Sequence, residues 1–220
     1  MENNFESISN NFDIPDEVMD EIQKNIENII ESFPIPDVNK IDVIKKINFM
    51  CSRSKYLSST DALTGLSNRR EFDNVAEKEF LRSKRYNRSM TIAVLDIDFF
   101  KNINDTYGHL CGDYVLKEIA YILISNFRKT DYVFRYGGEE FVIILPETDI
   151  KNSYIPLERL RKTIEKYEFC FHKKPFNITA SIGYAENNVS TLNELIENAD
   201  KSLYDAKFQG RNIIKAYIKN

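Results

Sequence analysis

The run Met90–Asp98, with the sequence MTIAVLDID, decides the class of fold. Its first part is apolar and rich in β-branched residues, which is typical of a strand buried on both faces. Asp96 and Asp98 follow at its end, and their spacing of two residues directs both side chains to one face. A carboxylate at the end of a buried strand is costly unless a cation lies against it, and Mg²⁺ is the natural candidate. We therefore expect Asp96 to be functional, while Asp98 either shares this role or caps the next turn.

Helical and strand patterns alternate on both sides of this run. Strands are expected over residues 90–97, 132–135, 140–145, 177–184 and 213–218, and helices over residues 69–86, 113–127, 150–168 and 192–208. Gly137 and Gly138 separate the second and third strands, a spacing that predicts a hairpin with positive φ at both glycines. A hairpin within the sheet favours an α+β fold, an α/β sandwich whose central sheet is mixed or antiparallel and is flanked by helices.

The predicted hairpin carries two adjacent carboxylates, Glu139 and Glu140, directly after its glycines. Neighbouring side chains on a strand point to opposite sides, so one of the two can bind a metal ion while the other reaches elsewhere. An acidic hairpin beside an acidic strand end favours phosphoryl transfer assisted by two metal ions.

The segment 99–113 is expected to be a loop that binds a nucleotide. Lys101 could neutralise the phosphates, and Asn104 and Asp113 could read the edge of a base. A carboxylate pairs well with guanine, which offers two adjacent N–H donors, and poorly with adenine, which has an acceptor at N1. This segment therefore favours guanine.

The composition excludes several classes of protein. The chain has 220 residues, of which 42% are hydrophobic and 29% charged, so it is neither a disordered tail nor a low-complexity linker. A net charge of −4 gives no global basic field for nucleic acid. The longest apolar run, Ile119–Ile124, is far shorter than the roughly 18 residues that cross a bilayer, and the first residues show no secretory signal, so we expect no membrane insertion. Three scattered cysteines and two histidines argue against disulfides and zinc, and favour a reducing cytoplasm.

Residues 1–57 show two helical patterns and no strand. The second pattern brings Val43, Ile47, Met50 and Leu57 onto a short heptad-like seam. Two interpretations stay open. The helices either pack on the following domain or form a stalk that joins two chains.

Four sequence blocks, in the same order, resemble the diguanylate cyclase, or GGDEF domain, family. They cover residues 61–70 (DALTGLSNRR), 96–113, 135–141 (RYGGEEF) and 199–212. The third block has Glu where the family name has Asp, a variant found among active members. The resemblance implies a GGDEF domain over residues 58–219 with a palm-like nucleotidyl cyclase fold, preceded by the N-terminal helical segment 1–57. It also implies condensation of two GTP molecules into cyclic di-GMP, with release of two pyrophosphates, by a homodimer.

The resemblance further implies a role for individual residues. The ligands of Mg²⁺, or alternatively Mn²⁺, would be Asp96, the Ile97 carbonyl, Glu139 and Glu140. The catalytic residues would be Glu139 as the base for the 3′-hydroxyl and Lys101 for the charge of the transition state. The substrate would be bound by Asn104 and Asp113 at guanine, Lys207 and Arg211 at the phosphates, and Gly137 and Gly138 alongside.

A second site is implied by Arg128 and Asp131, which fit the RxxD product-inhibition site of the family, with Arg159 as a further contact. The alternative is an ordinary surface turn. Other interpretations of the whole chain also remain: a catalytically silent receptor for GTP or cyclic di-GMP, a nucleotidyl cyclase with another product, or a structural interaction module.

Overall fold

The computed structural model describes residues 58–218 and, before them, only a few helical positions. These positions are Lys24, Asn28, Asp42, Val43, Lys45, Lys46, Ile47 and Met50. The chain divides into two compact units, Met1–Ser59 and Thr60–Asn220. The helices and the seam predicted for residues 1–57 otherwise lie outside the described residues. No helix in the described part of the chain is long and apolar enough to cross a membrane.

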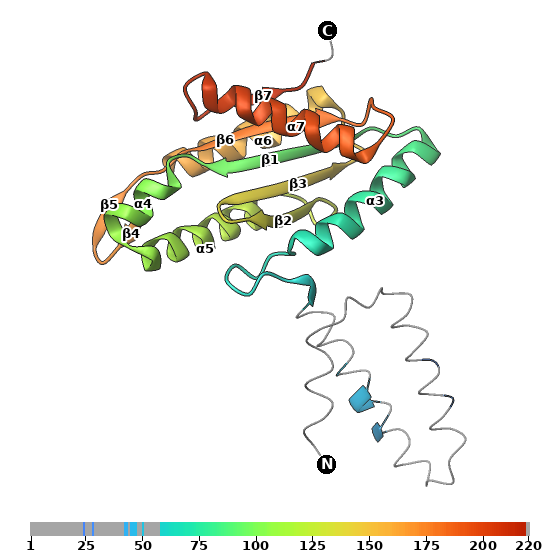
Figure 1. The fold of residues 1–220 in the computed structure, drawn as a ribbon, viewed down its shortest axis with the longest axis horizontal. Coiled ribbons are helices and arrows are strands. Elements are labelled where there is room, and N and C mark those ends of the chain that lie inside the picture. The colour runs from blue at the N-terminus through green and yellow to red at the C-terminus, as the bar shows by residue number, and fades with distance from the viewer. Residues whose placement is uncertain are drawn as a thin grey trace. The chain divides into compact units, whose positions relative to one another are not determined.

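The second unit is built around a five-stranded sheet with the strand order β2-β3-β1-β6-β7 (Figure 1). The helices are α3 (Arg69–Tyr86), α4 (Phe100–Tyr107), α5 (His109–Asn126), α6 (Ile150–Lys166) and α7 (Leu192–Phe208). The strands are β1 (Met90–Ile97), β2 (Tyr132–Gly137), β3 (Glu140–Pro146), β4 (Phe169–Phe171), β5 (Lys174–Phe176), β6 (Ala180–Glu186) and β7 (Ile214–Ala216). Three strand pairs are antiparallel and the β6–β7 pair is parallel, so the sheet is mixed. The predicted α+β fold with a mixed central sheet is confirmed.

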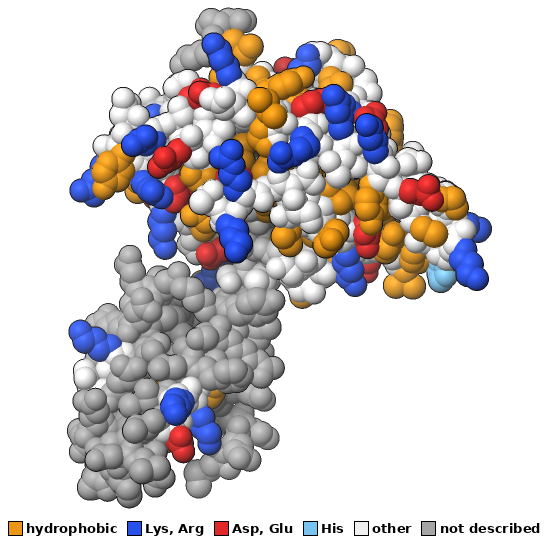
Figure 2. Space-filling model, turned by 180° about the vertical axis from the view of Figure 1, so that it is seen from behind, with side chains coloured by type: hydrophobic (Ala, Val, Ile, Leu, Met, Phe, Trp, Pro, Cys, Tyr) orange, Lys and Arg blue, Asp and Glu red, His pale blue; other side chains and the backbone are white. Residues whose placement is uncertain are grey.

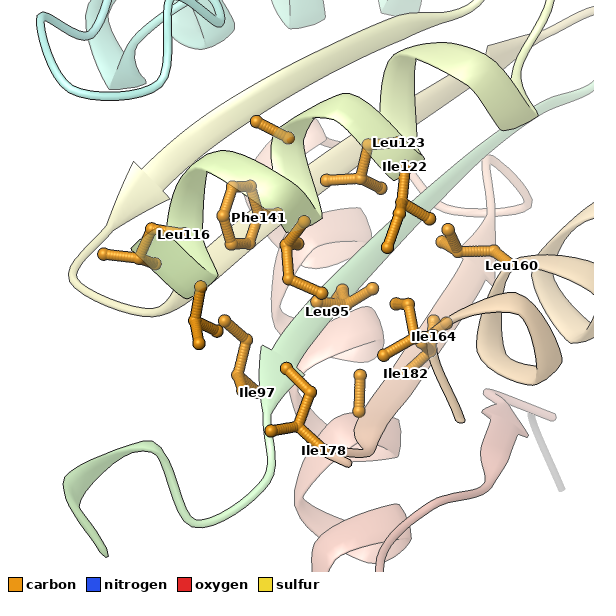
Figure 3. Close-up of a cluster of buried hydrophobic side chains, with 14 of the residues drawn as sticks. Leu95, Ile97, Leu116, Ile122, Leu123, Phe141, Leu160, Ile164, Ile178 and Ile182 are labelled. Atoms are coloured by element: carbon orange, nitrogen blue, oxygen red, sulfur yellow. The ribbon is translucent and has the colours of Figure 1, made fainter. Parts of the chain in front are cut away.

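All eight residues of β1 are buried because helices cover both faces of the sheet. Ala93 and Leu95 join the core formed with α5 and α6, while Ile92 and Val94 join the core formed with α3 and α7. Figure 3 shows the first of these cores, with Leu95 among side chains from α5, α6 and β6. Asp96 continues the alternation of Ile92 and Val94, so it lies on the face that α3 and α7 cover.

The predicted bounds of α3, β1 and α7 are confirmed to the residue. In α3, the side chain of Asn68 accepts the N–H of Glu71 at 3.1 Å, and Asn87 ends the helix in a left-handed conformation. These caps satisfy backbone groups that a helix end otherwise leaves unpaired.

The prediction of a loop over 99–113 is wrong, because α4 and the first turn of α5 occupy this segment. Phe100 and Ile103 are both buried and lie one turn apart, which gives α4 its apolar face. Gly108, with φ of 83°, separates α4 from α5. The segment is thus one short helix followed by the first turn of the long helix α5, an arrangement that its polar composition concealed.

The small β4–β5 hairpin was not predicted either. It is held by aromatic contacts, among them Phe176 stacked on Tyr107 of α4 at 5.2 Å and Phe171 against Tyr114 of α5 at 5.8 Å. Strands of three residues are too short to show a periodic pattern.

The hairpin between β2 and β3 also differs from the prediction. β2 runs through Gly137, which pairs with Glu140, so the central residues of the turn are Gly138 and Glu139. Gly138 has a φ of 20°, whereas Gly137 is not among the residues with positive φ. The register of the pair shifts between Arg135 and Gly137, and this irregularity moves the turn one residue along the chain.

Gly183 of β6 sets how closely α7 can lie on the sheet. A Cβ atom at this position would lie 2.0 Å from the backbone nitrogen of Leu203 and 2.3 Å from the carbonyl oxygen of Ala199. Neither atom can move without moving the helix. The close approach therefore requires glycine.

We predict that Gly183→Ala lowers the free energy of unfolding by at least about 1–3 kcal/mol, because overpacking against backbone cannot relax. Urea denaturation monitored by circular dichroism measures this loss. Gly137→Ala is the matched control, since its Cβ would meet only the Glu140 carboxylate, at an ordinary 3.7 Å. Equal stability of Gly183→Ala and wild type would contradict the close packing of α7.

Candidate active site

Asp96 and Glu140 are cross-strand partners at the last paired position of β1 and β3. Directly opposed residues of an antiparallel pair lie on the same face, with Cβ atoms about 4.5–5.5 Å apart. Glu139 lies in the turn directly before Glu140, and its carbonyl accepts the N–H of Ile97 at 3.4 Å. The strand pairing therefore gathers three carboxylates and the end of β1 in one place, as the sequence predicted for this group.

Burial raises the pKa of the Asp96 carboxyl above its ordinary value, and the charges of Glu139 and Glu140 raise it further. Lys207 of α7 opposes this effect, because its Nζ lies 2.8 Å from Asp96 Oδ2. Asp96 is only 8% exposed, so this ion pair is largely shielded from water. Lys207 therefore supplies a positive charge to a carboxylate that would otherwise be costly to bury.

Asp200 adds a fourth carboxylate that the sequence analysis did not single out. It lies two turns before Lys207 on α7, and its pKa is raised by burial and then by the charges of Glu140 and Glu197. The sequence did carry a signal for Asp200. It lies seven residues before Lys207, a spacing that places both side chains on one side of a helix.

The site fits a divalent cation that completes its coordination with phosphate. In the described part of the chain, no group of three or more His, Cys, Asp and Glu side chains is arranged to hold a metal ion by itself. Mg²⁺ commonly binds through one or two carboxylates together with substrate phosphates and water. Asp96 and Glu140, held side by side by the strand register, supply that number of carboxylates.

Arg135 of β2 holds the turn between β2 and β3 in place. Its guanidinium donates to the Gly138 carbonyl at 2.9 and 3.2 Å and to the Asp61 carboxylate at 2.9 and 3.1 Å. Burial raises the pKa of Asp61, but bonds from Thr64 and Arg135 outweigh it and the pKa is lowered. The first and third sequence blocks are thus joined by a charged pair that holds the turn in place.

Asn104 and Asp113, the predicted guanine contacts, are brought together by the α4–α5 junction. A Cβ atom on Gly112 would lie 2.0 Å from Asn104 Oδ1, so the amide of Asn104 packs directly on the glycine that precedes Asp113. Both side chains are half-buried, whereas Lys101, one turn before Asn104, is exposed. Gly112 therefore helps to determine how Asn104 packs at the α4–α5 junction, a role that was not predicted from the sequence.

Asp98 does not cap α4, in contrast to the alternative expected from the sequence. It is buried and accepts hydrogen bonds from Thr179 Oγ1 and Ser181 Oγ, both at 2.7 Å, and from the Asn212 backbone N–H at 3.0 Å. The N-cap residue of α4 is Phe99, which makes no side-chain capping bond. Asp98 thus fastens the loop after α7 to the end of β1, and its three donors favour Asp96 alone as the functional member of the pair.

Arg128 and Asp131 form a turn between α5 and β2, at the far end of β2 from the acidic hairpin. The Arg128 N–H donates to Asp131 Oδ2 at 2.9 Å, and the Asp131 N–H donates to the Arg128 carbonyl at 3.0 Å. Arg159 of α6 donates to the carbonyl of Asn126, the last residue of α5. The three predicted product-site residues therefore lie close together, away from Asp96. Figure 2 shows the molecule from the side opposite to Figure 1. On the side seen there, Lys and Arg side chains are spread among apolar ones.

Comparison with known proteins identifies the family of this domain. The family model described as "Diguanylate cyclase, GGDEF domain" matches residues 58–213. The chain belongs to the GGDEF domain family. It is 45% identical over 154 residues to the diguanylate cyclase DgcP of Pseudomonas aeruginosa, a match that covers 70% of this chain and 23% of DgcP. The chain spans between about a quarter and a half of the length of three curated relatives that it matches.

Solved structures of GGDEF domains share the fold. The coiled coil and GGDEF domain of DgcB from Caulobacter crescentus, in complex with c-di-GMP, aligns with a TM-score of 0.78 and 28% identity over 81% of this chain and 96% of that one. The active GGEEF domain of a diguanylate cyclase from Vibrio cholerae aligns with a TM-score of 0.67 and 30% identity over 70% of this chain and 99% of that one. That GGEEF domain has the same motif variant, with Glu at the third position, as Gly137–Phe141 here.

We predict that Gly112→Ala weakens binding of GTP about tenfold, because the added methyl group would displace the half-buried Asn104 amide, which the sequence predicts to contact the base. Isothermal titration calorimetry with a non-hydrolysable GTP analogue measures the change. In an Asn104→Ala background, Gly112→Ala should cause a much smaller further loss, since only the 3.1 Å approach of the added Cβ to the Phe100 ring remains. Wild-type affinity in the single Gly112→Ala variant would show that this corner does not contact the nucleotide.

Proposed function

We propose that this chain is an active diguanylate cyclase that condenses two GTP molecules into cyclic di-GMP and releases two pyrophosphates. The observation that carries the proposal is the pairing of Asp96 with Glu140, beside Glu139, at the end of a buried sheet. Like charges so close together require a cation, and a phosphorylated substrate brings further negative charge to be neutralised. The activity of named relatives with the same domain supports the proposal.

In the proposed reaction Asp96, Glu140 and the Ile97 carbonyl hold a divalent metal ion, which we take to be Mg²⁺, with Mn²⁺ as the alternative. When bound, this ion neutralises the phosphates and supports the departure of pyrophosphate. Glu139, in the turn, accepts the proton of the 3′-hydroxyl as this oxygen attacks the α-phosphorus of the second GTP.

Cationic residues of three elements serve the phosphates in this mechanism. Lys207, which pairs with Asp96 in the structure, would bind phosphate oxygens together with Arg211. Lys101, exposed on α4, offsets the charge that develops in the transition state. Gly137 and Gly138 allow the nucleotide to lie close to the hairpin backbone.

Specificity for guanine rests on Asn104 and Asp113 in this proposal. The Asp113 carboxylate accepts from the N1–H and N2–H₂ groups of guanine and would face a lone pair at N1 of adenine. Since the substrate is GTP, we propose that the domain works in the cytoplasm.

The alternative function is a silent GGDEF domain that binds GTP or cyclic di-GMP as a receptor. Such a domain needs no base and no metal ligands at the hairpin. The presence of Asp96, Glu139 and Glu140 together, and the strand register that unites them, favours the active enzyme.

We predict that Glu139→Gln and Asp96→Asn each lower the turnover of GTP about 10²–10⁴-fold with Mg²⁺ present, because charge rather than shape is required at both positions. Chromatography of the nucleotide products measures turnover. Glu77→Gln, an equivalent change at an exposed position of α3, is the matched control and should retain wild-type turnover. Near wild-type turnover of either site variant would remove that residue from the mechanism. A wild-type protein that binds GTP without forming product would establish the receptor instead.

We further propose that cyclic di-GMP inhibits the enzyme by binding at Arg128, Asp131 and Arg159. The backbone bonds of the Arg128–Asp131 turn leave the Arg128 side chain exposed, so its guanidinium is available to a phosphate or a guanine face. Arg159 adds a second cation beside the same turn. Because β2 separates this turn from the acidic hairpin, bound product would act at a distance from the catalytic groups rather than by competing with GTP.

We predict that Arg128→Ala retains its initial rate and loses sensitivity to added cyclic di-GMP. The alanine keeps the backbone N–H that closes the turn, so only the guanidinium is lost. Initial rates at rising product concentration measure the effect, and Lys129→Ala at the adjacent exposed position is the control. Inhibition of Arg128→Ala that equals wild type and is competitive with GTP would reduce the motif to a surface turn.

Two domains must face each other across two GTP molecules, because each domain supplies machinery for one of the two attacks. We propose that residues 1–57 join the chains of a homodimer. The alignment with the coiled coil and GGDEF domain of DgcB supports this, since it covers more of this chain than residues 58–213 alone. Among the described positions of the seam, Met50 is 60% exposed and Val43 38% exposed, and both are apolar.

We predict that the double substitution Ile47→Asp and Met50→Asp lowers activity per chain, most severely at low protein concentration. Buried charge would oppose association of the seam. Specific activity across a dilution series, with analytical ultracentrifugation, measures the effect, and Lys46→Asp is the control outside the seam. Activity per chain that stays constant on dilution for wild type and variant alike would contradict the stalk.

A further inference from the structure

The loop that follows α7 holds three successive residues in left-handed backbone conformations. Gly210 has a φ of 114°, Arg211 of 63° and Asn212 of 50°. Glycine adopts such angles freely and asparagine adopts them more readily than most residues, whereas arginine does so rarely, so Arg211 in particular must be held there by its surroundings. Strained residues of this kind persist only where several contacts determine them together.

Asn212 is fixed from three directions. Its backbone N–H donates to Asp98 Oδ2 at 3.0 Å, its Oδ1 accepts from Arg161 Nη1 at 2.7 Å, and its Nδ2 donates to Glu165 Oε1 at 2.6 Å. Arg161 is itself held by two hydrogen bonds to the Glu158 carboxylate, at 2.8 and 2.9 Å. These contacts anchor the backbone at Asn212. They thereby fix the direction in which the side chain of the preceding residue, Arg211, extends from the loop.

The side chain of Arg211 extends from this anchored backbone to Phe99. The guanidinium carbon lies 4.5 Å from the centre of the Phe99 ring, within the range of a cation–π contact. Phe99 directly follows Asp98 and is itself left-handed, with φ of 56°. The segments after β1 and after α7 are thus joined by two neighbouring contacts. Asp98 holds the backbone of Asn212, and Phe99 holds the side chain of Arg211.

The exposure of Phe99 is not explained by packing. Phe99 is 59% exposed and belongs to neither buried core, and its side chain makes no capping bond to α4, although an aromatic residue in this conformation is unfavourable. The Phe99 ring contacts the guanidinium of Arg211. In the described part of the chain this guanidinium has no ion-pair partner, whereas Lys207 is paired with Asp96.

We propose that Phe99 is a positioning residue that presents Arg211 to the phosphates of the nucleotide. A ring contacts only the face of a guanidinium and leaves its in-plane N–H donors for phosphate oxygens, whereas a carboxylate partner would consume them. Phe99 lies two residues after the end of β1, the strand that carries Asp96 and Ile97, so its ring holds the guanidinium near the strand end that carries the candidate metal ligands. The inference rests on the proposed binding of GTP phosphates by Arg211.

The test is calorimetric titration of a non-hydrolysable GTP analogue, with guanosine as a ligand that lacks phosphates. Phe99→Ala should bind the analogue about two- to five-fold more weakly, the range expected from loss of an exposed cation–π contact, and should bind guanosine as wild type does. Phe99→Leu, which keeps apolar bulk without a ring face, should match Phe99→Ala. Phe99→Tyr should restore wild-type affinity. In an Arg211→Ala background, Phe99→Ala should cause no further loss, and thermal unfolding should be unchanged throughout.

Each other outcome has a defined meaning. A wild-type protein that does not bind the analogue contradicts the proposed function itself. If wild type binds and Arg211→Ala is weakened but Phe99→Ala is not, the positioning role is overturned while the function stands. A loss in Phe99→Ala that persists without Arg211, or that is equal for guanosine, also overturns it, since the ring would then act without the guanidinium.

Discussion

The structure depends on one constraint, the pairing of Asp96 with Glu140 across the central strands at the end of a buried sheet. Two carboxylates in that position repel each other and lose much of their contact with water, so they persist only with positive charge nearby. In the structure that charge is Lys207, 2.8 Å from Asp96. We interpret the site as one that holds an internal cation until a metal ion and a phosphorylated substrate replace it.

Other features of the domain serve to place these charges. Gly183 lets α7 lie against β6 closely enough for Lys207 to reach Asp96. Arg135 ties the turn that carries Glu139 to Asp61 near the start of the domain. Asp98, which the sequence suggested as a second functional carboxylate, joins the loop after α7 to the end of β1. The chemistry of the site is thus built from segments more than 100 residues apart.

The sequence predicted best what long periodic patterns determine. The bounds of β1 follow from an apolar run rich in β-branched residues, and the RYGGEEF block located the acidic hairpin. Short elements were missed, because α4 and the β4–β5 hairpin depend on tertiary aromatic and apolar contacts rather than on their own pattern. The positive φ expected at Gly137 was wrong because a shift in strand register moved the turn to Gly138. Side-chain pairs such as Lys207 with Asp96 could not be read from spacing, since only the folded sheet brings them together.

The most direct test of this account is the position of a metal ion in a crystal of the chain grown with Mn²⁺ and a non-hydrolysable GTP analogue. Anomalous diffraction locates manganese independently of the protein phases. The account predicts an ion bonded to the carboxylates of both Asp96 and Glu140, with Lys207 moved from Asp96 to the phosphates. An ion bonded to neither carboxylate, with the Lys207–Asp96 pair intact beside bound nucleotide, would contradict it.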